Sequence, residues 1–272
     1  MGEKKIKNVN WKNILQNEAK LRGYSQRTID AYVYHVNRFI QSGKSAREFL
    51  LELINQKKAT ETVRGAGFAV KFYLKCMNER DTGIDEIINH IPNMKRGKKL
   101  PVILAKEEIE SMIESTNNLN HRTIMLIGYG AGLRASEICS LRWSDIDFKR
   151  NLIHVKQAKG KKDRIVMLST KVKKALRSLS KEQEGLVLVT TRGMKYTLRT
   201  IQMIIQNAAK KAGIRKKVTP HTLRHSFATH LLENGTDIRY IKDLLGHADV
   251  RTTLIYTKVS NKDLARIKSP LD

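Results

Sequence analysis

Apolar residues recur at helical spacing through the first third of the chain. Between residues 29 and 40 they fall three or four positions apart, which places them on one face of a helix. Ser25 precedes this stripe as a candidate N-cap, and Gly43 follows it where a helix commonly ends. Shorter stripes of the same kind occur at residues 11–15, 49–54 and 69–76. The pattern predicts a small helical bundle in this part of the chain.

The apolar pattern stays mostly helical in the remaining chain and is interrupted once. Residues 109–113 are apolar at helical spacing, and residues 124–127 form a short continuous apolar run. Two short β-branched segments, residues 152–156 and 164–168, flank a polar segment that contains Gly160. This combination is typical of a β-hairpin. We therefore predict a mainly α fold with one small β-hairpin or sheet.

A polar, basic segment between Pro92 and Pro101 separates the two parts of this pattern. Proline ends helices, and no apolar periodicity continues across the segment, so the sequence indicates an interdomain linker. Four of its side chains are cationic, namely Lys95, Arg96, Lys98 and Lys99. We place an N-terminal helical domain at residues 1–92, the basic linker at 93–101 and a larger domain at 102–272.

The charge balance points to a polyanionic partner. The chain carries 52 Lys and Arg against 26 Asp and Glu, a formal charge of +26, while 40% hydrophobic residues indicate a globular protein. No apolar run is long enough to span a membrane and the lysine-rich start lacks a signal peptide, so we expect a cytoplasmic protein with no membrane partner. Cys76 and Cys139 lack partners at zinc spacing and are expected to be reduced packing residues.

The sharpest local signal is a helix start at residues 219–225. Thr219 suits the N-cap and Pro220 the first helical position, so His221 and Arg224 share one face of the first turn. An imidazole and a guanidinium at the positive end of a helix dipole suit a phosphate oxyanion. The alternative is an ordinary helix whose first His and Arg are solvated.

A zinc site is a competing interpretation of the same segment, because His221 and His225 are four residues apart. However, no Glu follows His221 as in zinc-protease helices, and no Cys pair is near. Arg224 would also set a permanent cation against the metal. We therefore predict that the protein binds no metal.

Five segments in order resemble the tyrosine recombinase (phage integrase) family. They are residues 130–137 (GAGLRASE), the hairpin tip 159–161 (KGK), 221–231 (HTLRHSFATHL), 244–247 (LLGH) and Tyr256. Taken alone, a tyrosine in an apolar segment is usually part of a core. The catalytic match runs from about residue 104 to 256, whereas the N-terminal bundle matches only in general character. The layout is most similar to the Xer subgroup and implies a SAM-like core-binding domain before a mostly helical catalytic domain.

The resemblance implies roles for several residues in breaking a DNA strand. Tyr256 would be the nucleophile that attacks the scissile phosphate and leaves a 3′-phosphotyrosyl link. Arg134 and Arg224 would clamp the non-bridging oxygens and neutralise charge in the transition state. Lys159 would protonate the departing 5′-oxygen, although two further lysines follow within three residues and spacing alone leaves the choice open.

The remaining implied roles concern proton transfer and bracing. His221 would help to accept the tyrosine proton, and His247 would donate a hydrogen bond to a phosphate oxygen. Glu137 follows Arg134 by three residues and suits a brace for it, the alternative being a solvated glutamate in a first helical turn. Lys258 stands where many relatives have a histidine, which leaves the local positioning of the tyrosine open but not its identity.

The whole protein is then implied to recombine double-stranded DNA at specific sites without a cofactor, metal or ATP. The family acts as four protomers on two DNA sites, with a dimer or monomer as the free form; a regulatory or second recombinase subunit remains an open question. The linker cations would lie close to DNA phosphates. Near the C-terminus, Leu264, Ile267 and Leu271 share one helical face and would dock on a neighbour or on their own domain. The implied role is resolution of chromosome or plasmid dimers in the nucleoid.

Three alternatives to this role stay open from sequence. A phage or integron integrase would share every catalytic residue and differ in its target sites. A type IB topoisomerase would use the same tyrosine chemistry on one duplex. A non-catalytic DNA-binding protein would carry the charge with a relic of the site, which the intact set of six candidate catalytic residues argues against.

Overall fold

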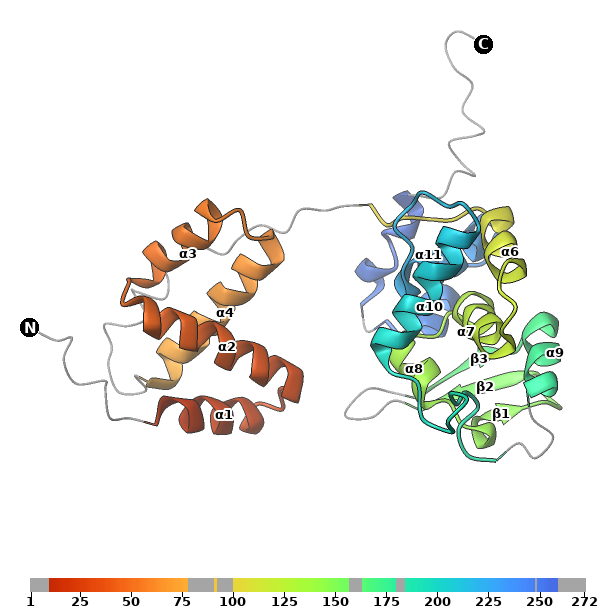
Figure 1. Ribbon diagram of the computed structural model, residues 1–272, viewed down its shortest axis with the longest axis horizontal. Coiled ribbons are helices and arrows are strands. Elements are labelled where there is room, and N and C mark those ends of the chain that lie inside the picture. Colours follow the sequence, from red (N-terminus) through yellow and green to blue (C-terminus); the bar gives the residue numbers. More distant parts are fainter. Residues whose placement is uncertain are drawn as a thin grey trace, which may run out of the picture. The chain divides into compact units, whose positions relative to one another are not determined.

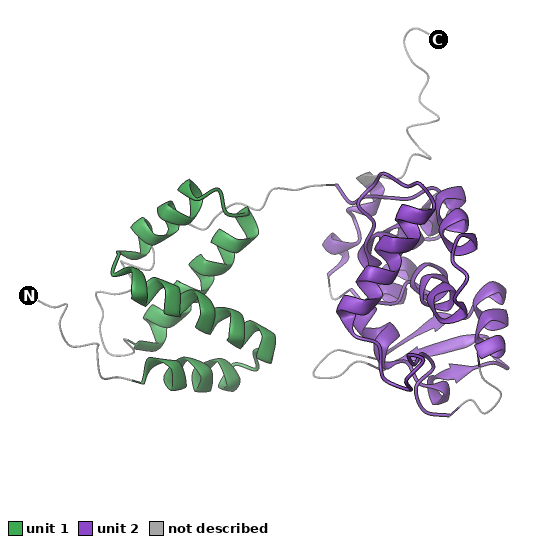
Figure 2. Cartoon of the chain, in the orientation of Figure 1, with its two compact units in different colours: residues 1–98 green, residues 99–272 purple. Residues whose placement is uncertain are grey.

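The computed structural model describes residues 10–77, 91, 100–156, 163–179, 184–247 and 249–258. The chain divides into two compact units, residues 1–98 and 99–272 (Figure 2). Among the described residues, helices are the main regular structure of both units, and the second unit also contains one small antiparallel sheet (Figure 1). The predicted mainly α fold with a small sheet is therefore confirmed.

Helices build the described part of the first unit, namely α1 (Trp11–Leu21), α2 (Gln26–Ser42), α3 (Ala46–Asn55) and α4 (Thr60–Met77). As predicted, α2 begins after Ser25, whose Oγ accepts a hydrogen bond from the Thr28 amide, and ends at Gly43, where φ is +61°. Buried side chains fill two clusters, and Phe39 and Leu74 pack against both. The two clusters therefore form one continuous core.

The second unit is built from seven described helices and three short 3₁₀ turns. The helices are α6 (Lys106–Glu114), α7 (Leu119–Gly130), α8 (Ala135–Ser140), α9 (Thr170–Leu179), α10 (Leu198–Lys211), α11 (Pro220–Glu233) and α12 (Ile238–Leu245). The 3₁₀ turns are η2 (Trp143–Asp145), η3 (Val250–Thr252) and η4 (Tyr256–Lys258). Thr219 caps α11 and Pro220 occupies its first turn, as the sequence predicts.

The sheet of the second unit is antiparallel in the order β1-β2-β3, with strands β1 (Ile146–Asp147), β2 (Leu152–Val155) and β3 (Arg164–Met167). In its register, Ile153 of β2 lies opposite both Ile146 and Val166. Strands β2 and β3 are the hairpin predicted from the sequence. The sequence did not reveal β1, because two residues are too few to show an alternating pattern.

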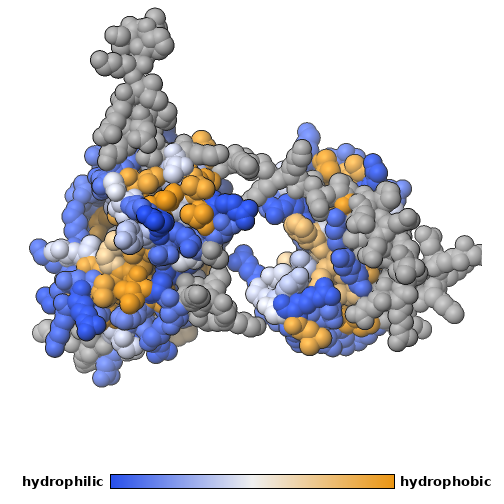
Figure 3. Space-filling model, turned by 180° about the vertical axis from the view of Figure 1, so that it is seen from behind, coloured by the Kyte–Doolittle hydropathy of each residue, from blue (hydrophilic) through white to orange (hydrophobic). Residues whose placement is uncertain are grey.

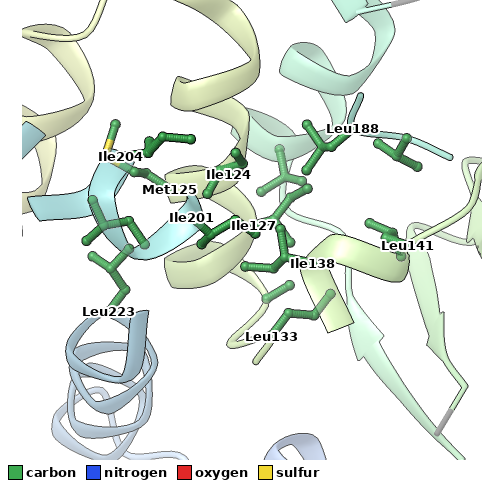
Figure 4. Packing of buried hydrophobic residues seen from close by; sticks show 14 of the residues in the cluster. Ile124, Met125, Ile127, Leu133, Ile138, Leu141, Leu188, Ile201, Ile204 and Leu223 are labelled. Carbon is green, nitrogen blue, oxygen red and sulfur yellow. The ribbon is translucent and has the colours of Figure 1, made fainter. Parts of the chain in front are cut away.

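Helix α7 runs through the core of the second unit, which explains its continuous apolar run. Figure 4 shows side chains of α8, α10 and α11 meeting those of α7, and labels among others Ile124, Met125, Ile127, Ile138, Ile201 and Leu223. Each of these six side chains is at most 1% exposed. Close packing of this kind fixes the ends of the helices, and therefore the segments that carry the polar residues described below.

The face shown in Figure 3 is mostly hydrophilic on both units, with apolar patches between the polar side chains. Such a surface is ordinary for a globular protein, because there is not enough polar surface to cover it completely. Among the described residues, no helix has the length and apolar character needed to cross a membrane.

Candidate active site

The start of α8, the start of α11, the end of α12 and η4 bring polar side chains together. Gly132 shapes the first of these segments, because its φ is +63° and a Cβ atom there would lie 2.5 Å from the Phe227 ring. The turn leaves Arg134 in extended backbone as the N-cap of α8. From there Arg134 reaches the end of α12, where its Nη2 donates to the Gly246 carbonyl over 3.3 Å.

Glu137 braces Arg134 through both its backbone and its side chain. Its Oε2 accepts from the Arg134 amide at 2.7 Å, and its Oε1 accepts from Arg134 Nη1 at 2.9 Å. The Glu137 side chain is only 9% exposed. The structure therefore places it as a brace and not as a solvated glutamate.

Arg164, which sequence analysis did not single out, completes this group of charges. Its Nη1 and Nη2 donate to the two oxygens of Glu137 at 2.8 and 2.7 Å. We call Arg134, Glu137, Arg164 and Arg224 the arginine cluster. The sequence did hold a signal, since Arg164 and Val166 are two apart on one strand and share the buried face of β3.

Three consecutive carbonyl oxygens at the end of α12 each accept a hydrogen bond from a different arginine of the cluster. The pairs are Arg164 Nε with Leu244 O (2.7 Å), Arg224 Nη2 with Leu245 O, and Arg134 Nη2 with Gly246 O (3.3 Å). The last carbonyls of a helix lack partners within it and lie at the negative end of its dipole. The end of α12 is therefore a natural acceptor for the three guanidiniums.

The arginine cluster keeps a surplus of positive charge. Burial alone would raise the pKa of Glu137, but hydrogen bonds and charge from Arg164 and Arg134 outweigh it and hold that pKa at about 2. Burial and the charge of Arg134 lower the pKa of Arg224 to about 9, which leaves it protonated at neutral pH. Three positive charges against one negative leave +2 in the cluster, which suits a bound anion such as a phosphodiester.

Tyr256 lies in an apolar pocket with its hydroxyl against a histidine. The residue is 2% exposed, and its oxygen lies 3.0 Å from His225 Nδ1. The other buried residues of this pocket are Phe227, Ala228, Ile241 and Leu245. The sequence interpretation gave the tyrosine proton to His221, whose ring centroid lies 6.2 Å from that of His225. The structure thus sets His225 on the hydroxyl, one helical turn beyond the residue chosen from the motif.

The histidines of the site are poised as neutral groups. The pKa of His225 and that of His247 are each lowered to about 4, and the pKa of His221 is also lowered. Burial is the largest cause in each case, and the positive charge of Arg224 adds to it. Burial raises the pKa of Tyr256, against an opposing effect of Arg224. At neutral pH a protonated tyrosine therefore meets a neutral imidazole.

The other predicted site residues fall into two groups. His247 follows the end of α12 with its Nδ1 3.0 Å from Thr253 Oγ1. Lys159 lies outside the described residues, as do the four linker cations Lys95, Arg96, Lys98 and Lys99 and the C-terminal residues Leu264, Ile267 and Leu271. Within the described ranges, no three His, Cys, Asp or Glu side chains gather so that they could hold a metal ion.

Comparison with known proteins places this arrangement in context. The model of the phage integrase family matches residues 102–263. Tyrosine recombinase XerA of Pyrococcus horikoshii is 37% identical over 256 residues, which cover 90% of this chain and 87% of that protein. A crystal structure of XerA recombinase is 29% identical with a TM-score of 0.55, covering 95% of this chain and 99% of that one. XerH bound to palindromic difH substrate shares the fold, with a TM-score of 0.72 at 22% identity over 93% of this chain and 82% of that one.

Proposed function

Since this chain belongs to the phage integrase family and is a site-specific tyrosine recombinase of the Xer kind, we propose that it breaks and rejoins DNA strands through Tyr256. The observation that carries this proposal is the Tyr256 hydroxyl held 3.0 Å from His225, whose lowered pKa keeps it neutral. The arginine cluster lies next to this pair, since the charge of Arg224 acts on both groups. A nucleophile, a base and fixed cations are what phosphoryl transfer requires.

In the cleavage step, the Tyr256 oxygen attacks the phosphorus while its proton passes to an imidazole. His225 is the base that the geometry favours, and His221 is the base that the family motif favours. A bond from phosphorus to Tyr256 forms as the bond to the 5′-oxygen breaks, leaving a 3′-phosphotyrosyl link. Lys159 would return a proton to the departing 5′-oxygen. Attack by the 5′-hydroxyl of another strand reverses these steps and releases the tyrosine.

The arginine cluster would stabilise the charge that develops on the phosphate. Arg134 and Arg224 keep N–H groups beyond those already bonded within the protein, because a guanidinium carries five. Arg134 is the more accessible, with 24% of its side chain exposed against 4% for Arg224. His247 would add a hydrogen bond to a phosphate oxygen from the end of α12.

We expect strand exchange to need neither ATP nor a metal ion. The phosphotyrosyl link conserves the energy of the phosphodiester that it replaces, so rejoining requires no other energy source. The arginines supply the positive charge that a metal ion provides in other phosphoryl-transfer sites. Cleavage by the full chain in the presence of a chelator and without nucleotide is the expected result.

The partner in this proposal is double-stranded DNA. The formal charge of +26 supports binding to phosphates, with an affinity that falls steeply as salt concentration rises. The first unit would serve as the core-binding domain and the linker cations would contact the backbone. Four copies would act on two DNA sites in the nucleoid, since exchange between two duplexes needs a nucleophile for each strand cut.

A covalent-adduct assay tests the proposal. The full chain is incubated with nicked duplexes that carry inverted repeats from its own genome, and products are separated by denaturing electrophoresis. Wild-type protein should give a DNA-linked band that Tyr256→Phe abolishes. Tyr240→Phe is the matched control, because Tyr240 is 68% exposed on α12 and should leave the adduct intact. An adduct in Tyr256→Phe would show that another residue is the nucleophile.

A further inference from the structure

Arg164 is buried, and each of its three side-chain nitrogens donates a hydrogen bond inside the protein. Its side chain is 6% exposed. Two of its nitrogens donate to Glu137 and the third donates to the Leu244 carbonyl over 2.7 Å. Stability alone does not explain such a residue, because well-packed apolar side chains stabilise a core as well as a buried ion pair or better. The first position of β3 therefore carries an arginine for a reason beyond packing.

Both partners of Arg164 in turn hold other guanidiniums of the site. Glu137 accepts hydrogen bonds from Arg134, and its Oε2 lies 3.9 Å from Arg224 Nη1. The end of α12, which Arg164 binds at Leu244, offers its next two carbonyls to the same two arginines. The Arg164 side chain thus links β3 to Glu137 and to the end of α12, the two groups that also hold Arg134 and Arg224.

We infer that Arg164 is a positioning residue for strand cleavage, which holds Glu137 and the end of α12 so that Arg134 and Arg224 meet the same phosphate. The inference rests on the proposed function. It gives Arg164 no contact with DNA. A misplacement of the clamping groups by about 1 Å is enough to slow such a reaction on the order of a hundredfold.

Two variants of the full chain separate the charge of Arg164 from its geometry. Arg164→Met removes both the positive charge and the hydrogen bonds, whereas Arg164→Lys keeps the charge but cannot form the bidentate contact with Glu137. We expect single-turnover cleavage of the nicked substrate to slow on the order of a hundredfold in the Met variant, with only partial recovery in the Lys variant. DNA affinity should stay at the wild-type value in both. Arg150→Met is the matched control, since its side chain is 81% exposed beside the same sheet.

A double-mutant cycle shows whether Arg164 acts through Glu137. If it does, Arg164→Met should add little to the loss already caused by Glu137→Gln, because the shared brace is gone. Additive losses would contradict the inference, as they would mean two independent contributions. Thermal unfolding of each variant identifies any that fail to fold. Should the Met variant be one of them, a wild-type cleavage rate in Arg164→Lys would equally overturn the inference.

The pH profile supplies a readout that a purely structural role would not move. The charged groups that face Glu137 are Arg134 from the start of α8, Arg164 from β3 and Arg224 from α11. Loss of Arg164 removes the strongest of the hydrogen bonds that lower the pKa of Glu137. Cleavage by Arg164→Met should therefore decline at a higher pH on acidification than cleavage by the wild type. The pKa of His247 should rise in the same variant, because the charge of Arg164 is one of the causes that lower it.

The outcomes distinguish the two proposals. Absence of any covalent adduct with the wild-type chain would contradict the proposed function itself. Adduct formation by the wild type, together with unchanged rate and pH profile in the Arg164 variants, would contradict only the role of Arg164. A parallel loss of DNA affinity and rate would mark Arg164 as a DNA contact and would overturn its role as a positioning residue.

Discussion

Each of the two units contains an ion pair of similar length, but the two pairs have different roles. In the first unit, Lys44 and Glu52 lie 2.9 Å apart with 46% and 37% of their side chains exposed. In the second unit, Arg164 and Glu137 lie 2.7 Å apart with 6% and 9% exposed. The distances are nearly equal, so distance says little about what either pair contributes.

Burial is what separates the two pairs. Water and salt screen the exposed pair, and holding two long side chains in place offsets most of the gain. The buried pair cannot lose one member without leaving charge in a poorly solvated place. It also lies among further arginines, so its carboxylate fixes several groups at once. The exposed pair therefore contributes little to the structure around it, whereas the buried pair fixes the positions of the neighbouring arginines.

Removal of the buried carboxylate should have the largest effect. We expect Glu137→Gln to lower the free energy of unfolding by about 3–5 kcal/mol, because three guanidiniums would share a pocket without compensation. Denaturant unfolding of the full chain, with cleavage rate as a second measurement, checks this. Glu52→Gln in the first unit is the control and should leave the second unit unaffected. A stability loss no greater than that of the control would remove the contrast between the pairs.

Acid should weaken this contrast by protonating Glu137. Its pKa is about 2 in the folded chain against an ordinary value of 4.5. The stabilisation is therefore fully present above pH 4.5 and is lost as pH falls toward 2. The difference amounts to about 3 kcal/mol, since each pKa unit corresponds to about 1.4 kcal/mol.

A comparison of two proteins isolates that effect from other titrations. The buried histidines destabilise the wild type and Glu137→Gln alike as pH falls from 6.5 toward 4, because their folded-state pKa values are depressed. The stability gap between the two proteins should instead close below pH 4.5. A stability gap that stays constant down to pH 2 would show that the negative charge of Glu137 does not stabilise the folded protein.

The smallest effect is expected at the exposed pair. Lys44→Met should leave the denaturation midpoint and the cleavage rate unchanged, because solvent already screens the charge that it removes. Chemical denaturation followed by a signal from the first unit checks this. A clear drop in the midpoint would mean that the exposed pair also organises its surroundings.

Local signals made much of the fold predictable. Ser25 and Gly43 mark the ends of α2 because capping and left-handed backbone depend on single residues. The hairpin of β2 and β3 is visible because alternation extends over several residues. Strand β1 was missed since Ile146 and Asp147 form it only by pairing with β2.

The site was less predictable because its contacts join distant segments. Arg164 is 27 residues from Glu137, and nothing local identifies the carboxylate that a buried arginine will meet. His221 and His225 lie four apart on one helix face, so the sequence could not tell which of them η4 would bring Tyr256 against. The nature of the groups was visible in the motifs, whereas their pairing required the packing of α8, α11, α12 and β3.

The ring of Phe227 stands between two parts of the molecule that are far apart in sequence. A methyl group added at Gly132 would collide with this ring at 2.5 Å, and the ring belongs to the same buried cluster as Tyr256. Any side chain at position 132 would have to displace this ring, which packs in the same cluster as the nucleophile. Substitution of Gly132 is therefore expected to disturb the packing around Tyr256, although the two residues are far apart in the sequence and have no direct chemical connection.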